Sequence, residues 1–164
     1  MSVRVDTLKP GPESGQVRVA IVVSRYNEWI TDRLRDGAVE ELRRRLGDAG
    51  EATIIPAPGA WELGYLSACA AASGAFDAIV ALGCLIKGET RHDEVIADAL
   101  CPALMRLSVE RRVPIGFGVL TVETAEQGEA RAGGEARGGE GRWNKGAEAM
   151  GAALDALFCA RAMR

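Results

Sequence analysis

The chain has 164 residues, of which 48% are hydrophobic and 26% are charged. This composition is typical of one folded globular domain and excludes a disordered or fibrous chain. The formal charge of −3 argues against a nucleic-acid partner, and because the sequence has neither a run of about 18 apolar residues nor an apolar signal segment, we expect no membrane partner and no secretion.

Residues 1–16 predict an N-terminal arm without a core of its own, because they are polar and include two prolines. One domain is then expected over residues 17–164. It opens with a nearly continuous apolar run over residues 17–23, which predicts a strand covered on both faces of a parallel sheet. A helix ending at Gly47 or Gly50 follows, because apolar residues recur every four positions. These residues are Ile30, Leu34, Ala38, Leu42 and Leu46.

The same alternation continues along the chain. Further strands are expected over residues 52–55, 78–83 and 113–120, and helices over residues 61–73, 95–111, 124–132 and 144–164. Pro102 is expected to kink the third of the five expected helices or to mark an early turn. Alternating strands and helices of this length predict right-handed crossovers. We therefore predict a flavodoxin-like three-layer α/β/α sandwich with a central four-stranded parallel sheet.

Aromatic residues gather where the predicted strands end. Tyr26 and Trp29 follow the first strand, Trp61 follows the second, and Phe117 lies in the fourth. Ligands of parallel sheets bind outside the carboxyl ends of the strands. These aromatic side chains therefore either plug the mouth of the sheet or form a stacking platform for a planar ring.

The third strand leads into a helix through residues 83–92. Backbone N–H groups at the start of a helix, together with the Thr90 hydroxyl, suit a phosphate, although a threonine in this pattern is more often a simple N-cap. His92 is the only histidine of the chain and is followed by Asp93 and Glu94. It is either an inert surface residue or, beside an anion site, a residue that transfers protons.

A glycine-rich segment over residues 128–146 carries Arg131 and Lys145. It matches neither a P-loop nor a dinucleotide-binding fingerprint, because no strand leads directly into it. A surface connection is the simplest interpretation. Arg131 ends a predicted helix, where its charge either interacts with the helix dipole or reaches an anion.

The four cysteines are scattered without a C-x-x-C pair, and three of them lie in apolar stretches: Cys69, Cys84, Cys101 and Cys159. We expect buried free thiols in a reducing cytoplasm. With a single histidine and this cysteine spacing, no metal site is expected.

Five motifs in this order resemble the 6,7-dimethyl-8-ribityllumazine synthase family of riboflavin biosynthesis, from Val17 to the last helix. They are Arg-Tyr-Asn at 25–27, Pro-Gly-Ala-Trp-Glu-Leu at 58–63, Leu-Gly through Gly-Glu-Thr-Arg-His at 82–92, Glu-Ala-Arg-Ala-Gly at 129–133 and Asn-Lys-Gly-Ala-Glu at 144–148. The resemblance implies a cofactor-free condensation of 5-amino-6-(D-ribitylamino)uracil with 3,4-dihydroxy-2-butanone 4-phosphate. Two alternatives stay open: an archaeal-type riboflavin synthase, and a flavin- or lumazine-binding storage protein without turnover.

The resemblance also implies roles by position. His92 is the proton-transfer residue. Phe117, Arg131 and Lys145 are expected to reach the site from a neighbouring subunit. The pyrimidine substrate is expected to contact Tyr26, Asn27, Ala60, Trp61, Glu62, Cys84, Leu85, Ile86 and Phe117. The butanone phosphate is expected to contact Glu89, Thr90, Arg131 and Lys145.

Three features depart from the commonest pattern of the family. Cys84 stands where threonine is frequent, which is tolerable if only its backbone is used. Glu89 places a carboxylate beside an expected phosphate, so its side chain must point away. The connection between Arg131 and Lys145 is longer than in compact members, which implies a homopentamer of about 87 kDa, five times the 17.4 kDa chain. The arm over residues 1–16 is expected to add a strand to a neighbouring subunit.

Overall fold

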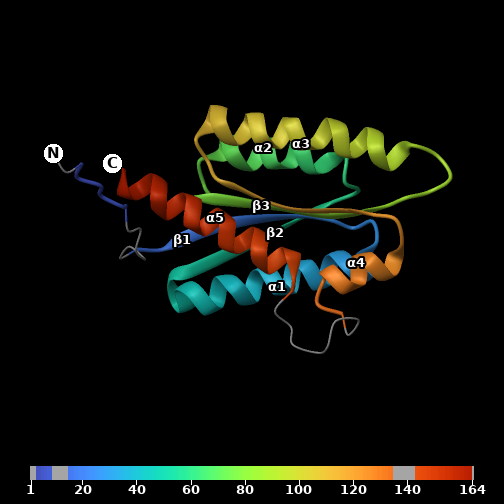
Figure 1. The fold of residues 1–164 in the computed structure, drawn as a ribbon, viewed down its shortest axis with the longest axis horizontal. Coiled ribbons are helices and arrows are strands. Elements are labelled where there is room, and N and C mark those ends of the chain that lie inside the picture. The colour runs from blue at the N-terminus through green and yellow to red at the C-terminus, as the bar shows by residue number, and fades with distance from the viewer. Residues whose placement is uncertain (1–2, 9–14, 135–142, 164) are drawn as a thin grey trace.

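The computed structural model describes residues 3–8, 15–134 and 143–163. Strands and helices alternate along it, as Figure 1 shows. The strands are β1 (Val17–Ser24), β2 (Gly50–Ala57), β3 (Ala78–Ile86) and β4 (Ile115–Val122). The helices are α1 (Glu28–Leu46), α2 (Glu62–Ser73), α3 (His92–Arg111), α4 (Ala125–Arg131) and α5 (Lys145–Ala162), with a short 3-10 turn η1 (Gly47–Ala49) after α1.

The four strands form one parallel sheet in the order β2-β1-β3-β4. Helices α2 and α3 lie on one face of the sheet, and α1, α4 and α5 lie on the other (Figure 1). The predicted flavodoxin-like three-layer sandwich is therefore confirmed. This order places β1 and β3 in the centre of the sheet. The loops after these two strands therefore lie side by side where the carboxyl ends of the strands meet.

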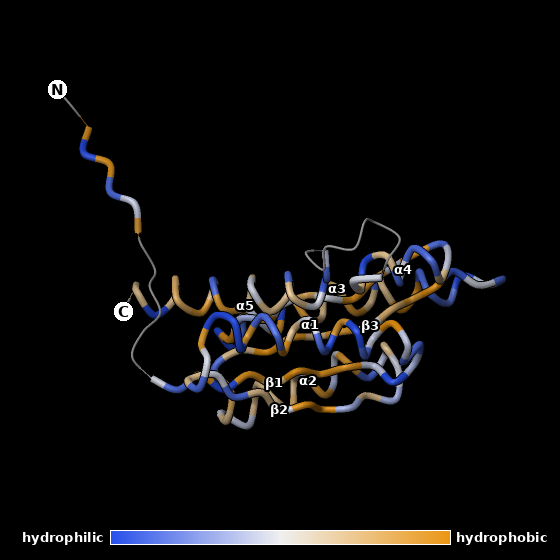
Figure 2. The backbone as a smooth tube through the Cα atoms, turned by 90° about the horizontal axis from the view of Figure 1, so that it is seen from below, coloured by the Kyte–Doolittle hydropathy of each residue, from blue (hydrophilic) through white to orange (hydrophobic). Residues whose placement is uncertain are grey.

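Side chains of β1 alternate between two apolar cores. Val19 and Ile21 pack with α1 and α5, whereas Ala20 and Val22 pack with α2 and α3. Both faces of the strand are covered, which explains its nearly unbroken apolar run. The strands accordingly stay orange for most of their length in Figure 2.

Three strand boundaries differ from the sequence prediction. Strand β2 extends over residues 50–57 and tolerates Pro56 because it is an edge strand. Strand β3 continues to Ile86, because Cys84–Ile86 pair with β4, so these residues are not part of a loop. Strand β4 starts and ends two residues later than predicted.

Pro102 lies inside α3, which runs without interruption to Arg111.

The prediction for the cysteines is mostly wrong. Only Cys84 is buried, whereas Cys69 and Cys101 are exposed and Cys159 is intermediate; all four are free thiols. Cys69 and Cys101 occur in apolar stretches of sequence but lie on the outer faces of α2 and α3.

Within the described residues no helix is long and apolar enough to cross a membrane.

The described residues of the arm, 3–8, are extended and exposed and lie outside the body of the domain (Figure 2). Val3 and Val5 expose 85% and 81% of their surface. The arm therefore makes no core within its own chain.

Candidate active site

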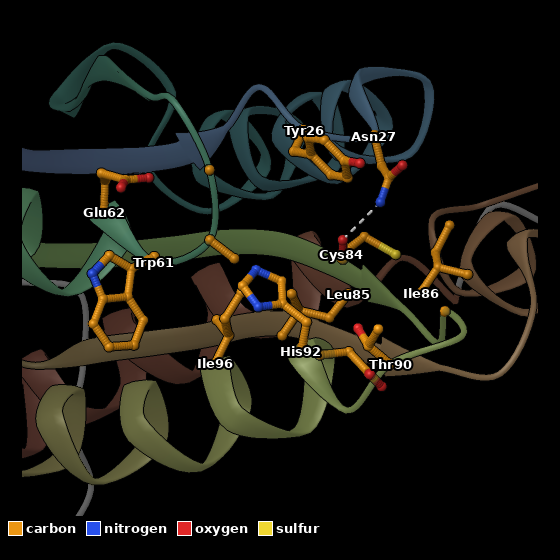
Figure 3. A pocket seen from close by; sticks show the side chains of 14 residues that line it. Tyr26, Asn27, Trp61, Glu62, Cys84, Leu85, Ile86, Thr90, His92 and Ile96 are labelled. Atoms are coloured by element: carbon orange, nitrogen blue, oxygen red, sulfur yellow. Dashed lines mark hydrogen bonds between the residues drawn. The ribbon is translucent and has the colours of Figure 1, made fainter.

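A cavity of about 490 Å³ lies at the carboxyl ends of β1, β2 and β3. This volume suits a small-molecule ligand. The loops after these three strands and the start of α3 supply its walls, as Figure 3 shows. The lining residues are Tyr26, Asn27, Gly59, Ala60, Trp61, Glu62, Cys84, Leu85, Ile86, Gly88, Thr90, His92, Asp93 and Ile96.

Asn27 ties the first wall to the central strand. Its backbone is in the left-handed region, with φ 61° and ψ 47°, which asparagine tolerates better than most residues. Its carbonyl accepts hydrogen bonds from the amides of Ile30 and Thr31 at 2.9 and 3.1 Å, which start α1. Its side-chain Nδ2 donates to the Cys84 carbonyl at 2.9 Å, the dashed line in Figure 3. The loop after β1 and the end of β3 are thus fixed relative to each other.

The aromatic residues at the cavity are open to solvent. Tyr26 exposes 71% of its surface and Trp61 exposes 59%. The Tyr26 amide donates to the Ser24 hydroxyl at 3.1 Å, and Ser24 also accepts a bond from Thr31 through its carbonyl at 2.7 Å, so the short loop is held from within. This exposure contradicts the interpretation that the aromatic side chains plug the sheet, and leaves them available to a planar ring.

His92 is the first residue of α3, and its imidazole lies in the cavity between Trp61 and Thr90 (Figure 3). The N-cap is Arg91, and no side chain caps the helix, so Thr90 is not the N-cap. The first amides of a helix without a capping side chain are suited to an anion. The imidazole therefore lies next to a position that favours negative charge.

Cys84 contributes its backbone carbonyl to the cavity wall, where it accepts the bond from Asn27. Its side chain is buried, and burial raises the pKa of the thiol to about 11. The sulfur is therefore a neutral thiol near neutral pH, without the thiolate that a nucleophile needs. The Cys84 carbonyl, by contrast, faces the Asn27 amide at the cavity wall.

Four residues assigned by resemblance do not line this cavity: Glu89, Phe117, Arg131 and Lys145. Glu89 is exposed. Phe117 is the third residue of the edge strand β4 and pairs with Ala81 of β3, so it is not at the carboxyl end of β4 as the sequence suggested. Phe117 and Lys145 line a second hollow between β4 and α5. Arg131 lies in the last turn of α4, where its guanidinium donates to the Gln127 carbonyl at 3.2 Å.

The cavity also contains residues that are not among the substrate contacts predicted from the sequence. Asp93 and Ile96 come from the first two turns of α3, and Gly59 and Gly88 come from the loops after β2 and β3. The spacing of Ile96 from His92 places both on one helix face and could have revealed Ile96. Among the described residues, no group of three potential metal ligands comes together.

A parallel α/β sandwich with an aromatic, amide and imidazole cavity at its strand ends defines a small-molecule-binding domain of the flavodoxin-like class. The family model for 6,7-dimethyl-8-ribityllumazine synthase matches residues 16–161. The chain therefore belongs to the 6,7-dimethyl-8-ribityllumazine synthase family.

Curated relatives agree over nearly the whole chain. A protein named 6,7-dimethyl-8-ribityllumazine synthase from Chlorobium chlorochromatii is 42% identical and covers 90% of this chain and 91% of its own length. Proteins of the same name from Edwardsiella ictaluri and Methylobacterium radiotolerans are 41% and 44% identical. They cover 91% and 92% of this chain, and 92% and 86% of their own lengths.

Proposed function

We propose that this protein is a 6,7-dimethyl-8-ribityllumazine synthase. It condenses 5-amino-6-(D-ribitylamino)uracil with 3,4-dihydroxy-2-butanone 4-phosphate. The single observation that carries the proposal is the cavity in which Tyr26, Trp61, Asn27 and His92 meet, in a chain that matches the family from residue 16 to residue 161.

The reaction divides into three steps. The free amine of the pyrimidine attacks the ketone, and loss of one water gives an imine. A proton then leaves the carbon chain, and the C–O bond to phosphate breaks, so the electron pair departs with inorganic phosphate. The enol that phosphate loss leaves behind takes up a proton at its terminal carbon and loses the hydroxyl proton, so that it becomes a ketone. Finally the ribityl-bearing nitrogen attacks this new carbonyl, and loss of a second water closes the ring. Electrons balance without an oxidant or reductant, and we propose that no cofactor takes part.

Apart from Phe117, the contacts that we propose for the pyrimidine come from one chain. We propose that Tyr26 or Trp61, which both line the cavity, stacks on the ring, and that Asn27 and Glu62 offer polar groups to the ring or the ribityl hydroxyls. The other contacts we propose for this substrate come from Ala60, Cys84, Leu85 and Ile86, which form the floor of the cavity. The buried neutral thiol of Cys84 fits a backbone role, so the departure from threonine is tolerable.

The phosphate half begins at the start of α3. We propose that the backbone N–H groups of Glu89 and Thr90 hold the phosphate, with the Glu89 side chain directed to solvent. His92, in the same cavity, transfers the protons. Most of the rate should come from positioning two reactive partners, because an amine and a ketone already condense in water.

We propose that a neighbouring subunit of a homopentamer supplies Phe117, Arg131 and Lys145. Two observations support this arrangement. Within the part of the chain that the structure describes, none of the residues that line the cavity is an arginine or a lysine, although a leaving phosphate needs cations. In addition, Phe117 is 47% exposed on β4, the strand at the sheet edge, where a second copy could contact it. The exposed arm over residues 3–8 is available to add a strand to such a neighbour.

Subunit mixing tests the shared site. Variants Arg131→Ala and His92→Ala are unfolded together in equal amounts and refolded as mixed rings. If each site takes His92 from one subunit and Arg131 from the next, about a quarter of the sites regain both groups, and activity exceeds that of either parent. A site built within one chain would give no gain. Light scattering of the wild type should give about five times the mass of one chain, and a megadalton shell would contradict the pentamer.

The activity itself is tested by mixing both substrates and following phosphate release and lumazine fluorescence together. A synthase produces both at equal rates. A riboflavin synthase of the same fold would consume the lumazine, and a storage protein would bind riboflavin tightly without releasing phosphate. Either result would exclude the proposal.

We also propose a cytoplasmic location. Cys69 and Cys101 are exposed free thiols, which stay reduced only where the surroundings are reducing. Fractionation of cells followed by immunoblotting tests this location.

A further inference from the structure

Asn144 joins three helices through one buried carboxamide. It exposes only 8% of its surface and precedes α5. Its Nδ2 donates to the Arg33 carbonyl of α1 at 2.8 Å and to the Ala132 carbonyl after α4 at 3.0 Å. Its Oδ1 accepts from the amides of Gly146 and Ala147 at 2.8 and 3.1 Å. The two donors and the two acceptor positions of the side chain are therefore all used.

Three glycines next to this carboxamide leave no space for a larger side chain or turn the chain beside it. A Cβ atom on Gly37 of α1 would overlap the Asn144 side chain. A Cβ atom on Gly146 would overlap the Leu34 carbonyl, so α5 can start this close to α1 only with glycine there. Gly133 turns the chain with φ 88°, and a Cβ atom there would lie 3.5 Å from Asn144 Nδ2. The side chain therefore has one tightly defined position.

The carboxamide also fixes the relation between two cations. Ala132 and Asn144 form an antiparallel bridge. Arg131, the last residue of α4, precedes the first of these residues and Lys145, the first residue of α5, follows the second, so each cation lies one residue from the bridge. Figure 1 shows α4, α1 and the start of α5 on the same side of the sheet. The bond from Asn144 Nδ2 to the Ala132 carbonyl directly links the start of α5 to the end of α4.

We propose that Asn144 is a positioning residue for the phosphate-bearing substrate, because its two Nδ2 bonds hold Arg131 and Lys145 at a fixed spacing. The inference rests on the proposed function, in which these two cations bind the butanone phosphate. It goes further in assigning substrate affinity to a buried amide that touches neither substrate.

The competing explanation is an ordinary helix cap. A cap needs only the oxygen that accepts from Gly146 and Ala147, and serine or aspartate serves that purpose as well as asparagine does. The bonds from Nδ2 to Arg33 and Ala132 are not part of a cap. Replacements that keep the oxygen and remove the N–H donors therefore separate the two roles.

The test uses Asn144→Ser and Asn144→Asp, with steady-state kinetics for each substrate. Both variants keep a capping oxygen, but serine removes the two N–H donors without adding charge, so it serves if the aspartate variant fails to fold. We expect the KM for the butanone phosphate to rise about tenfold in each, while the KM for the pyrimidine stays within about twofold. In an Arg131→Ala background, Asn144→Ser should add little to the KM that Arg131→Ala already raises.

Thr124→Ala is the matched control. Thr124 caps the opposite end of α4 by accepting from the Gln127 amide at 3.4 Å. Its loss should lower the thermal midpoint, as the Asn144 variants do, but leave both KM values unchanged.

The outcomes are distinguishable. Wild-type KM values in Asn144→Ser, together with a raised KM in Arg131→Ala, would overturn the positioning role and leave the proposed function intact. Equal increases in both KM values would also overturn it, because they indicate a general loss of structure. If Arg131→Ala changes neither KM, or the wild type forms no lumazine, the proposed function fails instead.

Discussion

The buried thiol of Cys84 makes stability depend on pH in a way that can be calculated. Burial raises the pKa of this thiol from 9.0 to about 11. The unfolded chain ionises at the lower value, so the unfolded state gains stability from ionisation first. The contribution of the neutral buried thiol is fully present below about pH 9 and is lost as the pH rises from about 9 to about 11.

The size of the effect can be worked out from the two pKa values. At about pH 10.5 the unfolded thiol is almost fully ionised and the folded one is mostly neutral, so the free energy of unfolding falls by about 2 kcal/mol relative to about pH 7.5. Cys84→Ala removes the titrating group. It also leaves a small cavity, but that cost is the same at every pH.

Urea unfolding of the wild type and of Cys84→Ala at a fixed protein concentration measures the difference. The fixed concentration matters because the stability of an oligomer depends on it. The wild type should lose about 2 kcal/mol more than Cys84→Ala over this interval. Cys101→Ala, in which an exposed thiol is removed, should behave like the wild type. Parallel pH curves for the wild type and Cys84→Ala would refute the reasoning.

Three further predictions concern the cavity and the core. His92→Ala should keep the fold and lower kcat by about tenfold to a hundredfold, since positioning persists without the proton-transfer group; unchanged steady-state kinetics would remove His92 from the mechanism. Asn27→Ala should lower the free energy of unfolding by about 2 kcal/mol in a urea titration. About half of this comes from the lost hydrogen bond to the Cys84 carbonyl, and half from holding alanine in a left-handed backbone conformation. The same variant should raise the KM for the pyrimidine. Gly116→Ala should lower the free energy of unfolding by more than about 2 kcal/mol, because its Cβ would overlap the backbone of α5. The control is Gly64→Ala. It should raise the thermal midpoint slightly, because Gly64 lies inside α2, where alanine is the better helix former, and its Cβ would be at an ordinary contact distance of 3.5 Å from the Leu100 side chain.

The sequence predicted the strands from their apolar runs because both faces of this sheet are covered. It missed their ends where pairing overrides local preference. Pro56 looks like a strand breaker, yet β2 is an edge strand and retains its pairing. Cys84 to Ile86 look like the start of a loop, yet they pair with β4.

The candidate site was predictable where it is built from the residues directly after each strand. Tyr26, Trp61 and His92 were found in this way, because parallel strands bring their carboxyl ends to one edge. The bonds of Asn144 were not predictable by such reasoning. Its partner Arg33 lies 111 residues away in the sequence, and a motif gives no indication of which carbonyl a buried amide will contact.

Helix α1 connects the two halves of the proposed site. Asn27 starts the helix and fixes it to β3 at the pyrimidine side, while Arg33 accepts the bond from Asn144 at the side of the two cations. Six residues of helix separate these points, a rise of about 9 Å. A helix keeps this length fixed. In each subunit, α1 therefore positions both the pyrimidine loop and the two cations, Arg131 and Lys145. In the proposed ring, each α1 would position the pyrimidine loop of its own subunit's site and the two cations that enter the neighbouring subunit's site. Asn27→Ala should therefore raise the KM for the pyrimidine, whereas Asn144→Ser should raise the KM for the butanone phosphate.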